Sequence, residues 1–161
     1  MINKWTIILL LLIGFSNNIM AAEIKTSIVI NATPKKIWQV LTDFSAYPFW
    51  NPFIKSITGN VKMGEKIKVE FEKMTFKPKV LKYTKNQEFE WLGHLLFSGL
   101  FDGKHRFLLI DNGDGTTTFQ HSESFKGILV PLFKKKLNTE FKPQFEEMNM
   151  ALKVLVELGD L

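Results

Sequence analysis

Residues 132–158, LFKKKLNTEFKPQFEEMNMALKVLVEL, decide the fold. Apolar side chains recur in this stretch at steps of three or four residues, which is the spacing of one face of an α-helix. The members of this face are Phe133, Leu137, Phe141, Phe145, Met148, Leu152 and Leu155. Charged residues such as Lys142 and Glu146 fall on the opposite face. A helix with so long an aromatic face needs a large concave partner, and the rest of the chain is expected to supply it.

Pro143 interrupts this helical pattern. A proline inside a helix has no N–H to donate, and its ring clashes with the preceding turn. The stretch is therefore not expected to form one straight rod. We predict a kink near residues 140–142, with a first segment over 131–139 and a main helix over 143–157.

The chain before this helix has mainly the pattern of β-strands. Alternating apolar and polar residues predict a first strand over 24–30. Thr33 and Pro34 then predict the start of a short helix, because threonine is a good N-cap and proline suits the first helical position. An aromatic, proline-containing connection follows over 47–53. Six further strands are predicted at 53–60, 66–72, 76–84 (which contains Pro78, typical of an edge or bulge), 88–91, 100–111 and 116–126.

Short turns between consecutive strands predict an antiparallel sheet, and Asn112-Gly113-Asp114-Gly115 is a strong hairpin signal. The predicted order is strand, helix, six strands and a long C-terminal helix. Helices placed at the two ends of a run of strands are typical of the α+β class. We therefore predict a helix-grip fold, in which a curved antiparallel sheet of about six to seven strands wraps around a C-terminal helix kinked near Pro143.

The composition bounds the class of protein. With 161 residues, 45% of them apolar, the chain is long enough for one domain with a single core, predicted over 23–161. The net charge of +5 comes from dispersed lysines with a single arginine, Arg106. Nucleic-acid surfaces cluster their cations and use several arginines, so no nucleic-acid partner is expected. The absence of cysteine excludes a thiol nucleophile, a disulfide framework and a cysteine-ligated metal.

The N-terminus has the layout of a secretory signal peptide over residues 1–22. Lys4 precedes an apolar run at 5–15, and Ala21-Ala22 offers a small-residue cleavage site. The run is too short to span a bilayer, which requires about 20 apolar residues. We expect an exported protein, periplasmic or secreted, cleaved near Ala21 or Ala22. A leader retained as an anchor remains the alternative.

Three polar residues on the last two predicted strands are candidates for chemistry. His105 shares a strand face with Phe107, and His121 and Glu123 share one with Phe119 and Phe125. Since the phenylalanines should point inward, the two histidines and Glu123 are expected to meet on the concave side, where burial would perturb their titration. The cluster has three interpretations: a structural hydrogen-bonded group, a polar anchor for a ligand, or an acid–base pair. The spacing does not favour a metal site.

Three other groups of residues have more than one interpretation. The amide of Asn51, next to Trp50, could hold a ligand oxygen or cap its own turn before Pro52. Phe71 and Trp91 could line a ligand cavity or belong to an ordinary core. The segment 92–101 is too apolar for an ordinary solvated loop. It could fold back onto the core, form a flap at a cavity mouth, or touch a membrane or a partner.

Three stretches resemble the SRPBCC superfamily, which includes the START, birch-pollen-allergen and polyketide cyclase/dehydrase-like proteins. They are 30–38 with the aromatic connection 47–53, then 103–107 with the hairpin and 118–127, and finally 145–153. The resemblance covers residues 24–157 in the expected order. It implies a deep apolar cavity between the sheet and the C-terminal helix. It does not imply one chemistry, because members include carriers, sensors, cyclases and hydrolases, so function must be argued from the site.

The resulting hypothesis is an exported, monomeric binding protein that holds a hydrophobic or amphipathic small molecule, such as a lipid, an isoprenoid or a polyketide-like compound, without a cofactor. The residues predicted to line its cavity are Trp50, Asn51, Phe71, Trp91, His105, Phe107, Phe119, His121, Glu123, Phe125, Phe141, Phe145, Met148 and Leu152. One alternative is a cyclase or dehydratase that uses His105, His121 and Glu123. Another is a module that contacts a membrane surface or a protein through the segment 92–101.

Overall fold

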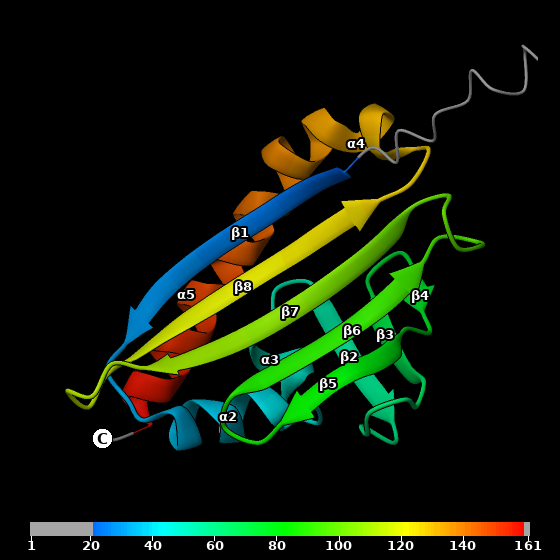
Figure 1. Ribbon diagram of the computed structural model, residues 1–161. Helices are drawn as coiled ribbons and strands as arrows, with labels where there is room; N and C mark the ends of the chain where they lie inside the picture. Colours follow the sequence, from blue (N-terminus) through cyan, green and yellow to red (C-terminus); the bar gives the residue numbers. More distant parts are fainter. Residues whose placement is uncertain (1–20, 160–161) are drawn as a thin grey trace, which may run out of the picture.

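The computed structural model describes residues 21–159 (Figure 1). The predicted signal peptide lies outside the described residues except for Ala21 and Ala22, which begin the first strand. The elements are β1 (Ala21–Ile30), α2 (Pro34–Thr42), α3 (Tyr47–Trp50), β2 (Ile54–Gly59), β3 (Ile67–Phe71), β4 (Thr75–Phe76), β5 (Lys79–Thr84), β6 (Glu88–His94), β7 (Asp102–Asp111), β8 (Thr117–Lys126), α4 (Val130–Lys136), the π-helical segment η1 (Leu137–Phe141) and α5 (Lys142–Leu158). None of the helices in this range is long and apolar enough to cross a membrane.

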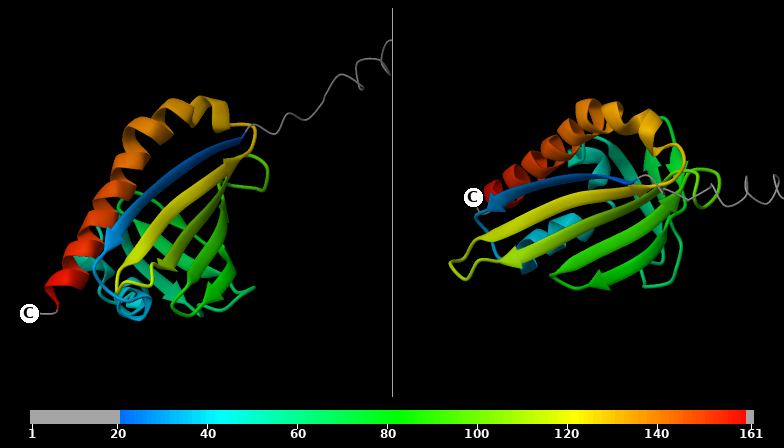
Figure 2. Two further views of the ribbon diagram at one scale, coloured as in Figure 1. Left: turned by 60° about the vertical axis from the view of Figure 1, so that its left-hand side comes forward. Right: turned by 45° about the horizontal axis from the view of Figure 1, so that its top comes forward.

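The strands form two antiparallel sheets. The larger has the order β1-β8-β7-β6-β5 and the smaller has the order β2-β3-β4. The long C-terminal helix α5 lies along one face of the curved larger sheet, and α2 and α3 lie near the C-terminal end of this helix (Figures 1 and 2). The predicted α+β helix-grip fold is confirmed.

Pro78 divides one predicted strand in two. The expected strand over 76–84 is instead β4, which pairs with β3, and β5, which pairs with β6. Proline has no N–H for a sheet ladder, so continuous pairing through this position is unfavourable. Seven strands therefore follow the short helices, where six were predicted, and an isolated bridge between Lys66 and Lys79 links the two sheets.

The C-terminal helical run bends before Pro143, as predicted (Figure 2). The α-helical pattern of α4 gives way to the π-helical segment η1, and α5 then starts with Pro143 in its first turn. A π-helical segment has wider hydrogen-bond spacing than an α-helix, and it accommodates the lost N–H and the bulk of the proline ring. The kink is thus an irregular turn within a continuous helical run.

The apolar face of α5 packs against the sheet, with one change from the predicted membership. Phe145, Met148 and Leu152 are buried as expected, but Leu155 is 41% exposed and Val156 is buried instead. Four-residue steps from Met148 lead through Leu152 to Val156, so the helix turns Leu155 away from the sheet. Met148, Leu152 and Val156 belong to a large core that contains many aromatic residues, and Phe145 belongs to a second, smaller one.

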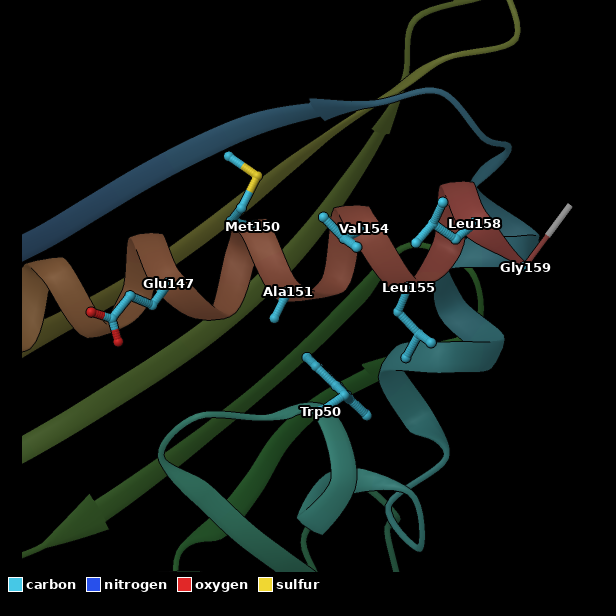
Figure 3. Close-up of a pocket in the computed structure, with 8 residues that line it drawn as sticks. All are labelled: Trp50, Glu147, Met150, Ala151, Val154, Leu155, Leu158 and Gly159. Carbon is cyan, nitrogen blue, oxygen red and sulfur yellow. The ribbon is translucent and has the colours of Figure 1, made fainter. Parts of the chain in front are cut away.

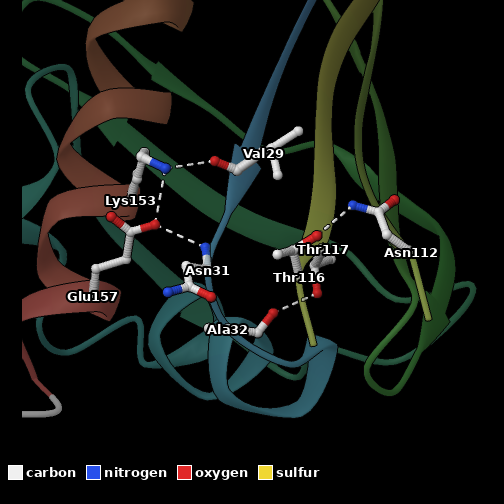
Figure 4. A network of polar contacts seen from close by, with 8 residues as sticks. All are labelled: Val29, Asn31, Ala32, Asn112, Thr116, Thr117, Lys153 and Glu157. Carbon is white, nitrogen blue, oxygen red and sulfur yellow. Dashed lines mark hydrogen bonds and ion pairs between the residues drawn. The ribbon is translucent and has the colours of Figure 1, made fainter. Parts of the chain in front are cut away.

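Polar contacts fasten the C-terminal end of α5 to the end of β1 (Figure 4). Lys153 Nζ donates to the carbonyl of Val29 at 2.6 Å, and Glu157 Oε1 accepts from the backbone N–H of Asn31 at 2.7 Å. Lys153 and Glu157 also pair with each other at 2.8 Å. The hydrogen bond from Lys153 and that from Asn31 hold the pKa of Glu157 below its usual range. These contacts fix the position of α5 along the sheet.

The apolar segment 92–101 divides between the core and the surface. Its first three residues complete β6, and Phe101 packs its ring on Phe125 and Phe133 with centroids 5.3 and 5.1 Å apart. Leu96 and Phe97 remain 86% and 60% exposed. The interpretation that the segment folds back onto the core therefore holds for only one part of it.

Gly127, between β8 and α4, gives a test of how this end of the fold is held together. Its φ is +138°, and an added Cβ would lie 2.5 Å from the carbonyl oxygen of Leu100. We expect Gly127→Ala to lower the free energy of unfolding by about 2 kcal/mol or more, measured by urea denaturation. Gly113→Ala is the matched control, because its φ is also positive but its added Cβ meets nothing within 4 Å; it should lose only about 1 kcal/mol. Equal losses would contradict the close approach at Gly127.

Candidate functional site

The two histidines and Glu123 meet on the inner face of the sheet, as their strand positions predict. His105 on β7 pairs directly across the ladder with Glu123 on β8, and Phe107 pairs with His121. His105 and His121 are buried, and the side chain of Glu123 is 21% exposed. The sheet register alone therefore assembles this polar group.

A buried polar chain runs from Glu123 through both histidines to Asn149 on α5 and Thr26 on β1. Glu123 Oε2 lies 3.3 Å from His105 Nδ1, and His105 Nε2 lies 3.0 Å from His121 Nε2. His121 Nδ1 lies 3.0 Å from Asn149 Oδ1. Asn149 Nδ2 donates to Thr26 Oγ1 at 2.9 Å, and that hydroxyl donates to the backbone carbonyl of His121 at 3.0 Å.

The direction of each hydrogen bond in this chain follows from its Thr26 end. Since Thr26 donates to a carbonyl, its oxygen must accept from the Asn149 amide, which turns Asn149 Oδ1 toward His121. His121 therefore carries its proton on Nδ1 and accepts at Nε2. A neutral His105 must then donate from Nε2, which leaves its Nδ1 as an acceptor facing Glu123. This arrangement requires a proton on the Glu123 carboxyl group.

The direction of the pKa shifts agrees with this protonation pattern. Burial lowers the pKa of His105 to about 3 and, aided by neighbouring His105, holds that of His121 well below its usual range. Burial raises the pKa of Glu123 to about 8. Each group is uncharged at neutral pH, because the interior solvates a charge poorly. The chain is thus a set of neutral hydrogen bonds in which Glu123 is the terminal donor.

Aromatic rings enclose the two imidazoles. Phe145 on α5 stacks on His121 with centroids 3.8 Å apart, and Trp91 on β6 stacks on His105 at 4.4 Å. Each pair of planes is within 6° of parallel. These contacts leave Glu123 as the one member of the chain with substantial exposure to solvent.

Gly103 makes room for the Glu123 side chain. It lies on β7, and a Cβ at this position would come too close to Glu123 Oε1 for any real contact. Any larger residue here would displace the carboxyl group from His105. Glycine at this position is therefore part of the same arrangement, although the sequence offered no separate signal for it.

Most of the other residues predicted to line a cavity are packed in the core. Trp91, Phe107, Phe119, Phe125, Phe145, Met148 and Leu152 are buried, and Phe71 and Phe141 are partly exposed. Asn51 is also buried, and its Oδ1 accepts from the backbone N–H groups of Phe53 and Ile54, which is the turn-capping arrangement. Trp50 lies elsewhere, beside the outer part of α5. A ligand-binding role for these residues stays a prediction.

Sequence reasoning missed Asn149 and Thr26. Asn149 follows Met148 and lies four residues after Phe145, inside the buried face of α5. A polar residue within an apolar helical stripe was the available signal, because buried amides require partners. Thr26 occupies the inward parity of β1 between Ile24 and Ile28, and a threonine there carries no comparable signal.

An apolar groove of about 700 Å³ lies between α3 and the outer side of α5 (Figure 3). Ala151 and Leu155 point from the helix toward Trp50 across the groove, as the close-up shows. The complete lining is Trp50, Glu147, Met150, Ala151, Val154, Leu155, Leu158 and Gly159. The indole N–H of Trp50 is buried and has no hydrogen-bond partner among the described residues. The groove is shallow, so a molecule bound there would keep part of its surface exposed to solvent.

The two features differ in the chemistry they allow. The groove is open to solvent and offers apolar contact with few polar groups. The polar chain contains groups of the types used in acid–base catalysis, but the surrounding aromatic rings and α5 shield His121 and Asn149 from solvent. Among residues 21–159, no group of three His, Cys, Asp or Glu side chains is placed to hold a metal ion.

The protonated Glu123 carboxyl predicts a specific dependence of stability on pH. Between its ordinary pKa of 4.5 and about 8, the folded protein keeps a proton that the unfolded chain loses. Glu123 therefore makes stability fall as pH rises through this range, by up to about 1.4 kcal/mol per pH unit, whereas His105 and His121, which are still half protonated at pH 6.5 in the unfolded chain, contribute a slope of the opposite sign that fades above about pH 7.5. The histidines contribute equally to the wild type and to Glu123→Gln, which still donates a hydrogen bond, so the stability of the wild type should fall relative to that of Glu123→Gln between pH 6.5 and 8 in urea denaturation. Equal slopes in the wild type, in Glu123→Gln and in the exposed-site control Glu65→Gln would contradict the assignment.

Comparisons with known proteins extend the structural findings. Residues 21–157 match the family described as polyketide cyclase/dehydrase and lipid transport. No curated protein matches the chain. Among solved structures, a START superfamily protein from Mycobacterium smegmatis is 22% identical, with 84% of this chain and 97% of that chain covered and a TM-score of 0.64.

Two further solved structures share the fold at lower identity. A point mutant of norcoclaurine synthase from Thalictrum, in complex with a transition-state analogue, is 14% identical, with coverage of 89% and 99% and a TM-score of 0.68. The di-domain ARO/CYC protein StfQ from the steffimycin biosynthetic pathway is 7% identical, with coverage of 88% and 52% and a TM-score of 0.71. Such similarities establish the fold alone, whereas the family match extends over nearly all the described residues. The chain therefore belongs to the polyketide cyclase/dehydrase and lipid-transport family.

Proposed function

We propose that this protein binds a hydrophobic or amphipathic small molecule in the groove between α3 and α5. The observation that carries the proposal is the groove itself, about 700 Å³ in volume and walled by Trp50 and the apolar outer side of α5. Burial of apolar surface contributes roughly 25 cal/mol per Å², so an apolar ligand of suitable size would gain affinity from these walls. The family match supports a binding role of this kind.

Trp50 supports an amphipathic rather than a purely hydrocarbon ligand. Its buried indole N–H has no hydrogen-bond partner within residues 21–159, and an unsatisfied buried donor costs about 1–3 kcal/mol. A ligand that brings a carbonyl or carboxylate oxygen to this ring would remove that cost when the indole turns toward it. The proposed ligand class is therefore a molecule with an apolar body and an oxygen acceptor, such as a fatty acid or a polyketide-like compound.

The space between the larger sheet and α5 is a less favourable place for the ligand. Side chains from both elements pack against one another there, including the stacked pair of His121 and Phe145. A molecule entering this space would have to displace buried aromatic rings and break the hydrogen bond between His121 and Asn149. The groove requires neither change.

Filling the groove tests the proposal directly. Ala151 lies in the groove wall and points toward Trp50, so Ala151→Phe would occupy the space that a ligand uses. We expect its affinity for the fluorescent fatty acid cis-parinaric acid to fall at least about tenfold, or about 1.4 kcal/mol. Trp50→Phe, which keeps an aromatic wall but lacks the N–H, should weaken the fatty acid more than a hydrocarbon of the same length.

Met63→Phe provides the matched control for this experiment. Met63 is exposed in the turn between β2 and β3, away from the groove, and the substitution adds an aromatic ring to the surface just as Ala151→Phe adds one to the groove. Its affinity for the fatty acid should equal that of the wild type. Unchanged binding in Ala151→Phe would refute the groove as the binding site.

A second candidate function is acid–base catalysis of the cyclase or dehydratase kind. The observation in its favour is Glu123, a carboxyl group with a raised pKa that remains 21% exposed and has two imidazoles behind it. Such an acid could protonate a bound carbonyl compound. The enclosure of both imidazoles by Trp91 and Phe145 argues against it. Cyclisation of a polycarbonyl compound by the wild type but not by Glu123→Gln, with binding retained, would establish catalysis.

We also propose that the protein is exported, with the leader removed near Ala21 or Ala22. Ala21 and Ala22 pair with Lys126 and Phe125 at the first two positions of β1, so cleavage after Ala22 shortens this strand by two residues and leaves the other eight pairs. We expect the protein recovered from the exported fraction of the cells that make it to start at Ala22 or Glu23, as measured by intact-mass spectrometry. Recovery of the full 161-residue chain from that fraction would indicate a retained anchor.

A further inference from the structure

We propose that one end of the molecule docks on an anionic membrane surface. This docking end consists of the loop 95–101 between β6 and β7 and the segment 126–136, which contains the end of β8 and α4. It goes beyond the proposed ligand groove, which lies on other residues of α3 and α5.

Backbone hydrogen bonds join the two segments into one surface. The N–H of Ile128 donates to the carbonyl of Gly99 at 3.1 Å, and that of Leu129 donates to Leu100 at 3.0 Å. Gly127 allows this approach, because any side chain there would strike the carbonyls of the loop. The ring of Phe101, at the end of the loop, packs against Phe125 and Phe133 and so holds the loop in place. The loop is thus held against the start of α4.

Large apolar side chains project from both segments into solvent. Leu96 is 86% exposed, Phe97 60%, Ile128 75% and Leu132 77%. Isolated exposed apolar residues are common on protein surfaces, but a group of four on two joined segments indicates an interaction site. Their burial in the outer layer of a bilayer would contribute favourable free energy.

The charge of the docking end matches an anionic partner. Residues 95–101 carry no charged side chain, residues 126–136 contain four lysines and no acidic residue, and the acidic residue that follows the loop is Asp102. Asp102 is already engaged by the N–H of Gly99 and by His94. On α4, Lys135 and Lys136 follow the exposed Leu132 by three and four residues, so they share its face of the helix. Apolar side chains flanked by lysines are typical of surfaces that insert among anionic lipid headgroups.

The N-terminus leaves the fold at the same end. Ala21, the first residue of β1, pairs with Lys126 next to Gly127. The start of β1 therefore lies beside the turn into α4, as both views show (Figures 1 and 2). Residues 1–20, with Lys4 and the apolar run 5–15, are joined to the fold here. Before its removal, a leader inserted in a membrane would bring the docking end toward that membrane, which favours a lipid surface over a protein partner.

Vesicle binding of the full chain tests the proposal. The probe is a phosphatidylcholine vesicle containing about one third phosphatidylglycerol, compared with phosphatidylcholine alone. We expect Phe97→Ser/Ile128→Ser to weaken binding to the anionic vesicle about tenfold, because it removes two of the inserted side chains. Lys135→Gln/Lys136→Gln should weaken it about tenfold at low salt, and this difference should largely vanish near 1 M NaCl, where charges are screened within about 3 Å.

Two control variants separate the docking end from general effects. Met63→Ser removes an apolar side chain from the turn between β2 and β3, and this side chain is 75% exposed, as is that of Ile128. Lys35→Gln/Lys85→Gln removes two lysines that lie together beside the turn preceding β6, at the opposite end of that strand from the loop 95–101. Both controls should bind as the wild type does, and the leader contributes equally to every variant.

Three results would overturn the proposal. The first is equal binding by the docking-end variants and their controls. The second is equal binding of the wild type to neutral and anionic vesicles. The third is loss of self-association or of a co-purifying protein in Phe97→Ser/Ile128→Ser with no change in vesicle binding, which would assign this surface to a protein partner.

Discussion

The fold depends on how a buried polar chain is satisfied between the sheet and α5. Asn149 is the contact that joins them, because it hydrogen-bonds to His121 on β8 and to Thr26 on β1. A shift of α5 by one residue would leave a buried amide and a buried imidazole without partners, and each such group costs about 1–3 kcal/mol. The apolar face of α5 could pack against the sheet in several positions, but the hydrogen bonds of the buried polar chain can form in only one of them. Hydrophobic burial supplies the stability, and the polar chain selects the register.

Much of the fold could be predicted from the sequence, because local patterns determine it. The two-residue alternation of β7 and β8 placed His105, His121 and Glu123 on one inner face, and Pro143 located the bend. The remaining features depend on tertiary contacts. Pro78 suggested an irregularity, but whether it would bulge a strand or divide it between two sheets depended on pairing partners. Nothing local to Trp50 shows that it faces Ala151 on a helix about 100 residues later, so the groove could not be foreseen.

The sequence could not distinguish two possible places for function, the interior and the groove. Residues predicted to line one cavity belong to two places: an enclosed aromatic and polar core, and an open apolar groove that includes only Trp50 from the predicted set. The family to which the chain belongs combines cyclase, dehydrase and lipid-transport descriptions. The accessibility of the chemical groups is therefore a better guide than family membership, and it favours binding at the groove over catalysis at the imidazoles.

The π-helical segment Leu137–Phe141 has a consequence for the evolution of this helical run. A π-helical turn accommodates one residue more than an α-helical turn, so it changes the phase of everything that precedes it relative to α5 by about 100°. The two halves of the run therefore present different faces: α5 turns its apolar residues toward the sheet, while α4 turns Leu132 and its lysines outward. Relatives that lack the extra residue should align with α4 only after a one-residue gap. An ungapped alignment would compare its outward positions with buried ones.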